Sequence, residues 1–497
     1  MTQRASLMRQ LENPALTPNQ RAELRCQVAR ELEDKGEYEA AREALGGLWQ
    51  GVGERPHVEG LEQSTAAEVL LRVGVLTGWL GSIHEIKDAQ ERAKNLISES
   101  ARLFESQKKI LESETELAFC YWREGGYDEA RVILRDVLSQ LKTDSELKAK
   151  AILRSAIVEW SSLYYSNALC ILSDAAPLFE KINNPTIKGG YFDALAGVLV
   201  NLGASEHRED YTDRAFVEYA AASFHFEQAG HKRYLANVEN NLGFLYFKVG
   251  KFTEAHKHLD YARRILTSLK DSGTVAQVDE TRARVFIAQE KYSHAESVAR
   301  SAVRILEKGG RQSLLAEALT THGVALARLS YHEQARFTLY RAVEVAHVSG
   351  AVNTAGHAAL AIIEELSGHL SADEMQAVYQ RAYQWLLASQ ESHTLQRLLK
   401  AANRVLSAYG GAQGTLSKLE AGTKGTLKDV MLKYEKEILR QALRAANGSV
   451  TRAADLLGIH YQSLVYALKN RHRDLVLERS PAKPRKPYRR SIIKKPE

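Results

Sequence analysis

The sequence predicts an all-α protein in which a long solenoid of paired helices is followed by a small helical domain. Three observations support this fold class. Small residues recur with a period of forty, only 9 of the 497 residues are proline, and a glycine-rich stretch precedes the last segment. Because proline interrupts helices, so few prolines leave long helices possible nearly everywhere. A chain of this length also exceeds one globular core, which favours a repeat array or several domains.

The forty-residue period is clearest over residues 200–345, where pairs of alanines stand seven residues apart. The pairs are Ala215/Ala222, Ala255/Ala262, Ala295/Ala302 and Ala335/Ala342. Twelve residues before each pair stands another small residue, in turn Gly203, Gly243, Ala283 and Gly323. Two antiparallel helices that pack closely need a small residue where their backbones cross. Each period therefore predicts one helix pair.

The segment that begins at Asn240 shows both helices of such a pair. Its first helix carries apolar residues at helical spacing, namely Leu242, Leu245, Tyr246 and Val249. Gly250 ends that helix, and a second amphipathic helix begins at Phe252. We interpret Tyr246 and Phe252, the aromatic residues on either side of this turn, as core residues.

This pattern resembles the tetratricopeptide repeat, which is a pair of antiparallel helices with small residues at the crossing points. That repeat is 34 residues long, so each unit here is about six residues longer. Less regular copies begin at Gly36 and Gly125. The period after Ala335/Ala342 places Met375 and Ala382 at the two alanine positions, so the repeat becomes irregular there, as expected of a terminal repeat. We predict roughly eight to ten helix pairs over residues 21–405, after an N-terminal segment of residues 1–20.

The resemblance implies a concave face that is lined by the first helix of each pair and that binds a peptide or protein. Asn201 and Asn241 occupy the same repeat position, and Asn237 lies one helical turn earlier. In some tetratricopeptide domains an asparagine there holds the backbone or the C-terminal carboxylate of a peptide. Arg282 and Arg284 follow in the next repeat. These five residues are the predicted partner-binding set; the alternative is a solvated polar face.

A flexible linker is predicted over residues 406–426, where glycine is frequent and apolar periodicity is lost. Thr426 can then cap a helix whose apolar stripe is Leu427, Val430, Met431, Ile438, Ala442 and Leu443. Asn447 and Gly448 end this helix in a left-handed turn.

Two shorter helices follow, from Thr451 to Leu457 and from His460 to about Asn470. The spacing of Ala454, Gly458 and Leu464 is that of a helix-turn-helix. The alanine must be small because the last helix crosses it, and the glycine permits a tight turn. The exposed face of the last helix can then enter a major groove of DNA.

Residues 427–475 resemble the Fis-type helix-turn-helix of bacterial regulators, which implies DNA binding and a homodimer. Carried over by position, the DNA-binding residues are Ser449, Thr451, Arg452, His460, Tyr461, Gln462, Ser463 and Tyr466. Gln462 can pair bidentately with adenine. Tyr461 and Tyr466 stand where the family commonly has Arg or Lys, and His460 where it commonly has a Ser or Asn cap. The recognition helix alone is therefore expected to bind phosphates weakly.

Basic residues behind this helix are expected to supply the missing phosphate contacts. From Thr426 onward there are 17 Lys and Arg against 7 Asp and Glu, although the whole chain carries only +6. We assign phosphate contacts to Lys469, Arg471, Arg473, Arg485, Lys486, Arg489 and Arg490. The tail, residues 476–497, is predicted to be disordered by itself and to settle along DNA. A merely solubilising tail is the alternative.

Catalysis is not expected, because the sequence contains no HExxH, G-x-S-x-G, CxxC or nucleotide-binding loop pattern. His256 and His258 lie two apart on a helix and make an unlikely metal site. The cysteines Cys26, Cys120 and Cys170 are too widely spaced for a disulfide framework. No cofactor and no metal are predicted. The absence of a signal core and of a run near ~18 apolar residues predicts an intracellular protein without membrane contact.

The combined expectation is a sequence-specific, DNA-binding transcriptional regulator in the bacterial cytoplasm, associated with the nucleoid, whose repeat body senses a peptide or protein. The alternative is a repeat scaffold that assembles a protein complex and attaches it to DNA nonspecifically. A third hypothesis is an inhibitor or chaperone-like adaptor with a vestigial DNA domain.

Overall fold

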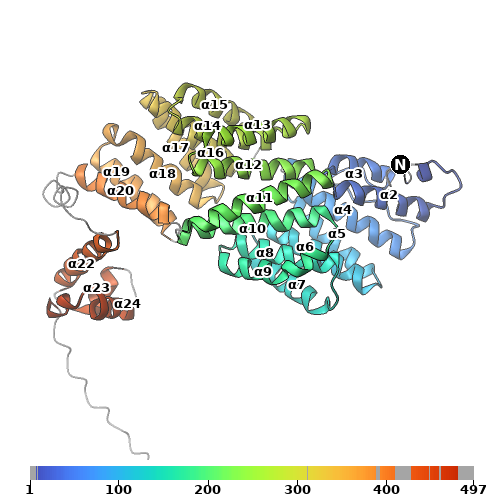
Figure 1. Ribbon diagram of the computed structural model, residues 1–497, viewed down its shortest axis with the longest axis horizontal. Coiled ribbons are helices and arrows are strands. Elements are labelled where there is room, and N and C mark those ends of the chain that lie inside the picture. The colour runs from blue at the N-terminus through green and yellow to red at the C-terminus, as the bar shows by residue number, and fades with distance from the viewer. Residues whose placement is uncertain are drawn as a thin grey trace, which may run out of the picture. The chain divides into compact units, whose positions relative to one another are not determined.

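The computed structural model describes residues 7–478 apart from 8, 85, 207, 310–311, 388–391, 409–426, 447 and 458–460. Every regular element in these ranges is a helix, so the predicted all-α class is confirmed. The chain forms two compact units, Met1–Tyr409 and Gly410–Glu497 (Figure 1). We call them the body and the C-terminal unit.

The body consists of nine consecutive helix pairs, within the described residues, followed by α20 (Ser392–Ala408). The first helices are α2 (Pro18–Glu33), α4 (Gln63–His84), α6 (Gln107–Arg123), α8 (Glu146–Ser161), α10 (Pro185–Glu206), α12 (Lys232–Lys248), α14 (Ser272–Ala288), α16 (Gln312–Arg328) and α18 (Val352–Leu366). The second helices are α3 (Tyr38–Leu45), α5 (Ala89–Leu103), α7 (Tyr127–Gln140), α9 (Tyr165–Lys181), α11 (Glu209–Ala229), α13 (Phe252–Ser268), α15 (Tyr292–Gly309), α17 (His332–Val348) and α19 (Ala372–Leu386). Each helix packs on its pair partner and on the neighbouring pairs, as in a tetratricopeptide-like solenoid. α20 continues to Ala408, so its last residues fall within the range predicted as linker.

The small residues of the forty-residue period lie at the helix crossings, as predicted. All eight alanines of the four pairs are fully buried. A Cβ atom added to Gly243 would lie 2.6 Å from Cγ of Leu259, on the facing helix α13. Gly323 stands in the same relation to Leu339, also at 2.6 Å. The two helices of each pair therefore approach so closely that a Cβ atom at these positions would crowd the facing leucine.

The turn inside the three pairs from α12 to α17 keeps one backbone geometry even where its glycine is lost. Gly250 has φ 75°, which confirms that it ends the first helix of its pair. Forty and eighty residues later, Glu290 and Ser330 adopt φ 60° and 65°. Positive φ is uncommon for residues with a side chain, so the packing of the pair fixes this turn more strongly than its sequence does.

The turn between α2 and α3 contacts the start of α10 and the start of α12, although these helices are far apart in the sequence. Thr186 Oγ1 donates a hydrogen bond to the Asp34 carbonyl, at 3.0 Å. The ring of His231, the residue that caps α12, packs on Gly36, where a Cβ atom would lie 2.4 Å from the ring. Burial lowers the pKa of His231 to about 3. The first pair of the body therefore contacts the fifth and sixth pairs directly.

Helix α4 is the one element in the described part of the chain that is long and apolar enough to cross a membrane. It is not an uninterrupted apolar run, because it contains Glu68 and Arg72. Of its most apolar stretch, 78% is buried inside the body. Core helices of this length pass the same test of length and composition, and α4 packs on both α2 and α5.

The C-terminal unit consists of α22 (Leu427–Ala445), α23 (Val450–Leu456) and α24 (Tyr461–Tyr466), then a π turn (Ala467–Arg471) and a 3₁₀ turn (Arg473–Glu478). Gly448 has φ 76° and its N–H donates to the Leu443 carbonyl at 2.7 Å, as predicted for the end of the first helix. Gly458 lies outside the described residues.

The core of the C-terminal unit is small and made of alanines and leucines from every one of its elements. Its buried members are Leu439, Ala442, Leu443, Ala446, Ala453, Ala454, Leu464, Ala467, Leu468 and Leu475. Ala454 and Leu464 are packed together as the helix-turn-helix spacing predicts. The predicted stripe was wrong at Ile438, which is exposed, because the helix turns Leu439 inward instead. Leu475 extends the folded unit into the 3₁₀ turn.

Candidate DNA-binding and ligand-binding surfaces

One face of α24 is free of the core and carries polar and aromatic side chains. Tyr461 and Tyr466 are 52% and 62% exposed, and Gln462 is exposed beside them. Leu464, on the opposite face, and Leu468, in the π turn that follows, are buried and fix this orientation. A helix held in this way presents an amide and two phenol groups outward, which can donate to and accept from base edges and phosphates.

The start of α23 adds further donors to the exposed surface of this unit. Ser449 precedes the helix, and its hydroxyl accepts a hydrogen bond from the Arg452 N–H at 3.4 Å. Thr451 and Arg452 are exposed in the first turn. Backbone N–H groups at a helix start also attract phosphate oxygens. The sequence-predicted residues Ser449, Thr451 and Arg452 are thus accessible to a polyanion.

The cations that follow α24 are less free than the sequence predicts. Arg471 is ion-paired with Glu435 of α22, with 3.0 Å between Nη1 and Oε1. The other oxygen of Glu435 lies 2.9 Å from Nε2 of the buried His472. Arg473 is exposed and donates to the Lys469 carbonyl, while Lys469 extends into solvent. Sequence periodicity did not reveal the carboxylate that takes up the charge of Arg471.

Some predicted DNA-binding positions lie outside the described residues. They are His460, the side chain of Ser463, and the tail residues Arg485, Lys486, Arg489 and Arg490.

The three asparagines predicted to bind a partner lie on the first helices α10 and α12 but differ in their surroundings. Asn237 is exposed and Asn201 is half-buried. Asn241 Nδ2 donates to Asp193 Oδ1 on α10, at 3.4 Å. Burial raises the pKa of Asp193 to about 6. Asn241 therefore already has a partner within the body, whereas Asn237 is open to a ligand.

The two predicted arginines on α14 point in different directions. Arg282 lies between Asp279 and Asp260, at 2.9 and 3.0 Å, and so faces the second helix α13. Arg284 lies 5.2 Å from the ring centre of Phe244 on α12, beside Glu280. Only Arg284 therefore faces the neighbouring first helices, and the structure does not bring the two arginines to one site.

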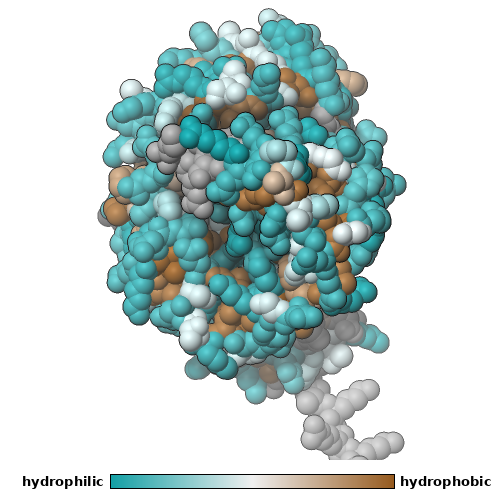
Figure 2. Space-filling model, turned by 90° about the vertical axis from the view of Figure 1, so that its right-hand side faces the viewer, coloured by the Kyte–Doolittle hydropathy of each residue, from teal (hydrophilic) through white to brown (hydrophobic). Residues whose placement is uncertain are grey.

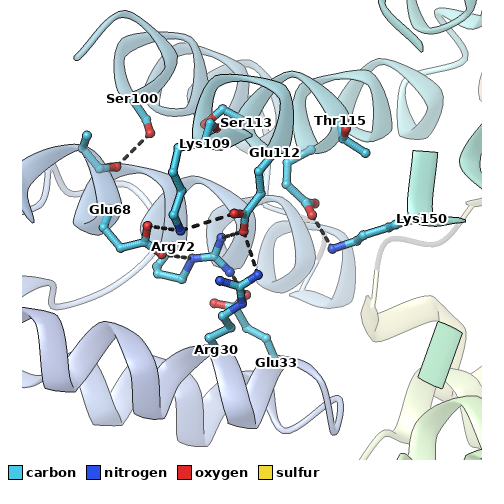
Figure 3. A network of polar contacts seen from close by, with 12 residues as sticks. Arg30, Glu33, Glu68, Arg72, Ser100, Lys109, Glu112, Ser113, Thr115 and Lys150 are labelled. Atoms are coloured by element: carbon cyan, nitrogen blue, oxygen red, sulfur yellow. Dashed lines mark hydrogen bonds and ion pairs between the residues drawn. The ribbon is translucent and has the colours of Figure 1, made fainter. Parts of the chain in front are cut away.

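A buried network of ion pairs on the N-terminal first helices was not predicted (Figure 3). Arg72 of α4 is 4% exposed and lies 2.8 Å from Glu33, 3.4 Å from Glu68 and 3.1 Å from Glu112. Burial raises the pKa of Glu33 to about 7. Although burial opposes it, Arg72 holds the pKa of Glu112 below its usual value. The spacing of forty between Arg72 and Glu112 was the signal in the sequence, since it matches the repeat period.

A cleft of about 890 Å³ opens between α2, α4 and the loop after α5. Its lining holds more carboxylates than cations, namely Glu23, Glu62, Glu68 and Glu105 against Arg30 and Lys109. Figure 2 looks onto the side of the body to which these N-terminal helices belong, and hydrophilic side chains cover most of it. Among the described residues, no group of three His, Cys, Asp or Glu side chains is arranged to hold a metal ion.

One family model matches a segment of the C-terminal unit. Residues 433–470 match the model of the family described as "Bacterial regulatory protein, Fis family". This segment runs from α22 through α24 and includes the exposed face described above. A comparison of the sequence with curated proteins gave no match.

Several solved structures resemble the chain at low sequence identity. A Rap protein in complex with Competence and Sporulation Factor is 13% identical, with a TM-score of 0.48 over 69% of this chain and 99% of its own. The STAND signal-transduction ATPase with a tetratricopeptide repeat sensor from Pyrococcus horikoshii is also 13% identical, with a TM-score of 0.48 over 80% and 67%. Yeast Tom70 is 13% identical, with a TM-score of 0.41 over 84% and 88%. The description of the body as stacked helix pairs rests on its own helices.

Proposed function

We propose that this protein is a non-enzymatic, DNA-binding transcriptional regulator whose helical-repeat body receives a peptide or protein partner. The observation that carries the proposal is the Fis-family match over residues 433–470, in a unit whose core leaves Tyr461, Gln462 and Tyr466 exposed. Helix-turn-helix domains place such a face in the major groove. The proposal locates the protein in the cytoplasm, on the nucleoid.

Within this proposal Gln462 reads a base and the surrounding residues position the unit on the backbone. Ser449, Thr451, Arg452, Tyr461 and Tyr466 contact phosphates or base edges, and Lys469 and Arg473 add charge. Because one such unit has a small surface and few free cations, two copies acting on a two-fold site would bind more tightly than one. We therefore propose a homodimer, with α22 contributing to its interface.

The body is proposed to bind its partner on the face formed by the first helices. Asn237 is the strongest of the predicted contacts because it is exposed and lies one turn from Asn241. Asn201 and Arg284 extend the same face, on α10 and α14. Partner binding would then change how the reading units of a dimer are presented to DNA.

Selection of DNA from a random pool by the full-length protein tests this function. One preferred sequence should emerge, and Gln462→Ala should lose about 1–3 kcal/mol of discrimination at one base pair. The matched control is Gln334→Ala, since Gln334 is exposed on the second helix α17 of the body. Equal loss in both variants would contradict the role given to Gln462.

The scaffold alternative is favoured by one specific observation. The recognition surface has few free cations, because Tyr461 and Tyr466 stand where the Fis family commonly has Arg or Lys and Arg471 is ion-paired with Glu435. A protein that only attaches to DNA would bind selected and random duplexes with equal affinity, at the same salt concentration. A regulator of this class discriminates between them by about 10³-fold or more.

A further inference from the structure

Aromatic side chains from several helix pairs gather on the inner face of the N-terminal part of the body. The rings of Tyr38 and Trp79 are stacked, with 4.8 Å between their centres. Phe119 of α6 and Tyr234 of α12 approach Trp79 to 5.9 and 6.2 Å. Tyr38 is buried, but Trp79, Phe119 and Tyr234 are each partly exposed. The group lies where the coil of the chain brings α3 next to α12, and it retains access to solvent.

Arg123, the last residue of α6, stacks on this aromatic group. Its guanidinium carbon lies 4.0 Å from the ring centre of Trp79 and 4.6 Å from that of Phe119. On α4, Gly78 leaves the space that Nη1 occupies, because a Cβ atom there would lie 2.9 Å from it. Stacking on two rings holds the guanidinium plane and restricts its rotation.

Arg123 has no partner for its charge among the described residues. None of its five N–H donors has a hydrogen-bond acceptor there, no carboxylate forms an ion pair with it, and Nη2 is itself buried. Two other arginines, on the neighbouring first helices α4 and α8, have carboxylate partners. Arg72 pairs with three glutamates, and Arg154 lies 2.7 Å from Glu116 and donates to the Thr115 carbonyl.

An unpaired buried cation is unfavourable by itself. Burial lowers the pKa of Arg123; the neighbouring Cys120, Tyr38 and Tyr234 oppose this shift, and the charge of Arg154 adds to it. Buried polar groups in proteins nearly always have partners, so an arginine that is fixed in place with all its donors free is typical of a site that is completed by a ligand.

We propose that Arg123 binds an oxyanion, the carboxylate or phosphate group of a ligand that enters the inner face of the N-terminal helix pairs. The guanidinium would donate two parallel hydrogen bonds to two oxygens of the anion, while Trp79 and Phe119 hold its plane. The inference rests on the proposed function only in treating the body as the part that receives a ligand. It places the recognition of charge at Arg123, far in sequence from Asn237 and Arg284.

The test is an anion titration of the full-length protein followed by tryptophan fluorescence. Sodium acetate and inorganic phosphate are each exchanged for sodium chloride at constant ionic strength and neutral pH. We expect a saturable change with at least one oxyanion, because Trp79 contacts Arg123. Arg123→Gln should weaken the apparent affinity by about tenfold or more, the range for a lost charged hydrogen bond. Arg135→Gln is the matched control, since Arg135 is exposed on the second helix α7.

The outcomes separate the sources of the anion and decide the proposal. A response to acetate indicates a carboxylate ligand, and a stronger response to phosphate indicates a phosphorylated one; both support the site. No saturable response in the wild type, or equal affinity in folded Arg123→Gln, overturns it. If circular dichroism shows that Arg123→Gln is unfolded, Arg123→Lys decides: weaker binding supports the site and unchanged binding overturns it. DNA affinity, measured in parallel, tests the proposed function independently.

Discussion

Replacing Arg72 by methionine should destabilise the body strongly, and more at high pH than at low pH. Arg72 is 4% exposed and is the cation shared by Glu33, Glu68 and Glu112 (Figure 3). Removing one partner of a buried ion pair leaves an uncompensated charge and costs about 3–5 kcal/mol. Arg55→Met is the control, because Arg55 and Glu99 are 60% and 35% exposed and such surface pairs contribute about 0–1 kcal/mol.

The pH dependence of this loss follows from the two carboxyl groups whose pKa values are shifted. Glu33 has a folded pKa of about 7, above its ordinary 4.5, so its contribution is present at low pH and is lost as the pH rises through 7. Glu112 has a lowered folded pKa, so its contribution is present at high pH and is lost on acidification. Without Arg72 that second contribution is reduced, although Arg30 and Lys109 still pair with Glu112, and the charged form of the buried Glu33 loses the cation that favours it.

Urea unfolding of wild type and variants, followed by circular dichroism on either side of this pH range, measures the effect. The deficit of Arg72→Met relative to wild type should be largest above pH 7 and should shrink towards pH 5, where Glu33 is protonated. The same deficit at both pH values, or a deficit no larger than that of Arg55→Met, would refute the assignment of Arg72 as the shared counter-charge.

Three further predictions concern packing and DNA binding. Gly243→Ala should destabilise the body by a net ~1–2 kcal/mol, since crowding against Leu259 outweighs the gain in helix propensity; Gly47→Ala, which meets no atom within 4 Å, should be near neutral in the same thermal melt. Leu464→Ala removes a fully buried side chain from a ten-residue core, so a loss of ~2–5 kcal/mol should unfold the C-terminal unit and abolish DNA binding in a gel-shift assay while the body melts as before. Deletion of residues 479–497 should lower DNA affinity and flatten its dependence on salt, as expected when phosphate contacts are lost; an unchanged salt slope would contradict a role for the tail in binding.

The regular part of the fold was predictable because it depends on local sequence. Alanine and glycine at the helix crossings are required by close packing, so their forty-residue period gave the helix pairs directly. The same holds for Ala454 and Leu464, whose spacing defines the helix-turn-helix. Positive φ at Glu290 and Ser330 shows the limit of this approach, since only the packed pair reveals those turns.

Features that depend on contacts between distant segments were not predictable from spacing alone. The closure of the first five pairs brings Tyr38 next to Tyr234, nearly two hundred residues later, and no periodicity records that contact. Repeat position placed Arg282 and Arg284 together, although two residues apart on a helix point to different faces. The sequence likewise predicts a free charge at Arg471, but Arg471 is ion-paired with Glu435, which lies more than thirty residues earlier in the chain.

The central claim is that the C-terminal unit reads specific DNA, and genome-wide mapping of the DNA bound by the intact protein tests it most directly. We predict a limited set of strongly occupied sites that share one sequence, with occupancy at those sites lost in Gln462→Ala and kept in Gln334→Ala. Uniform occupancy with no shared sequence, unchanged by Gln462→Ala, would contradict it.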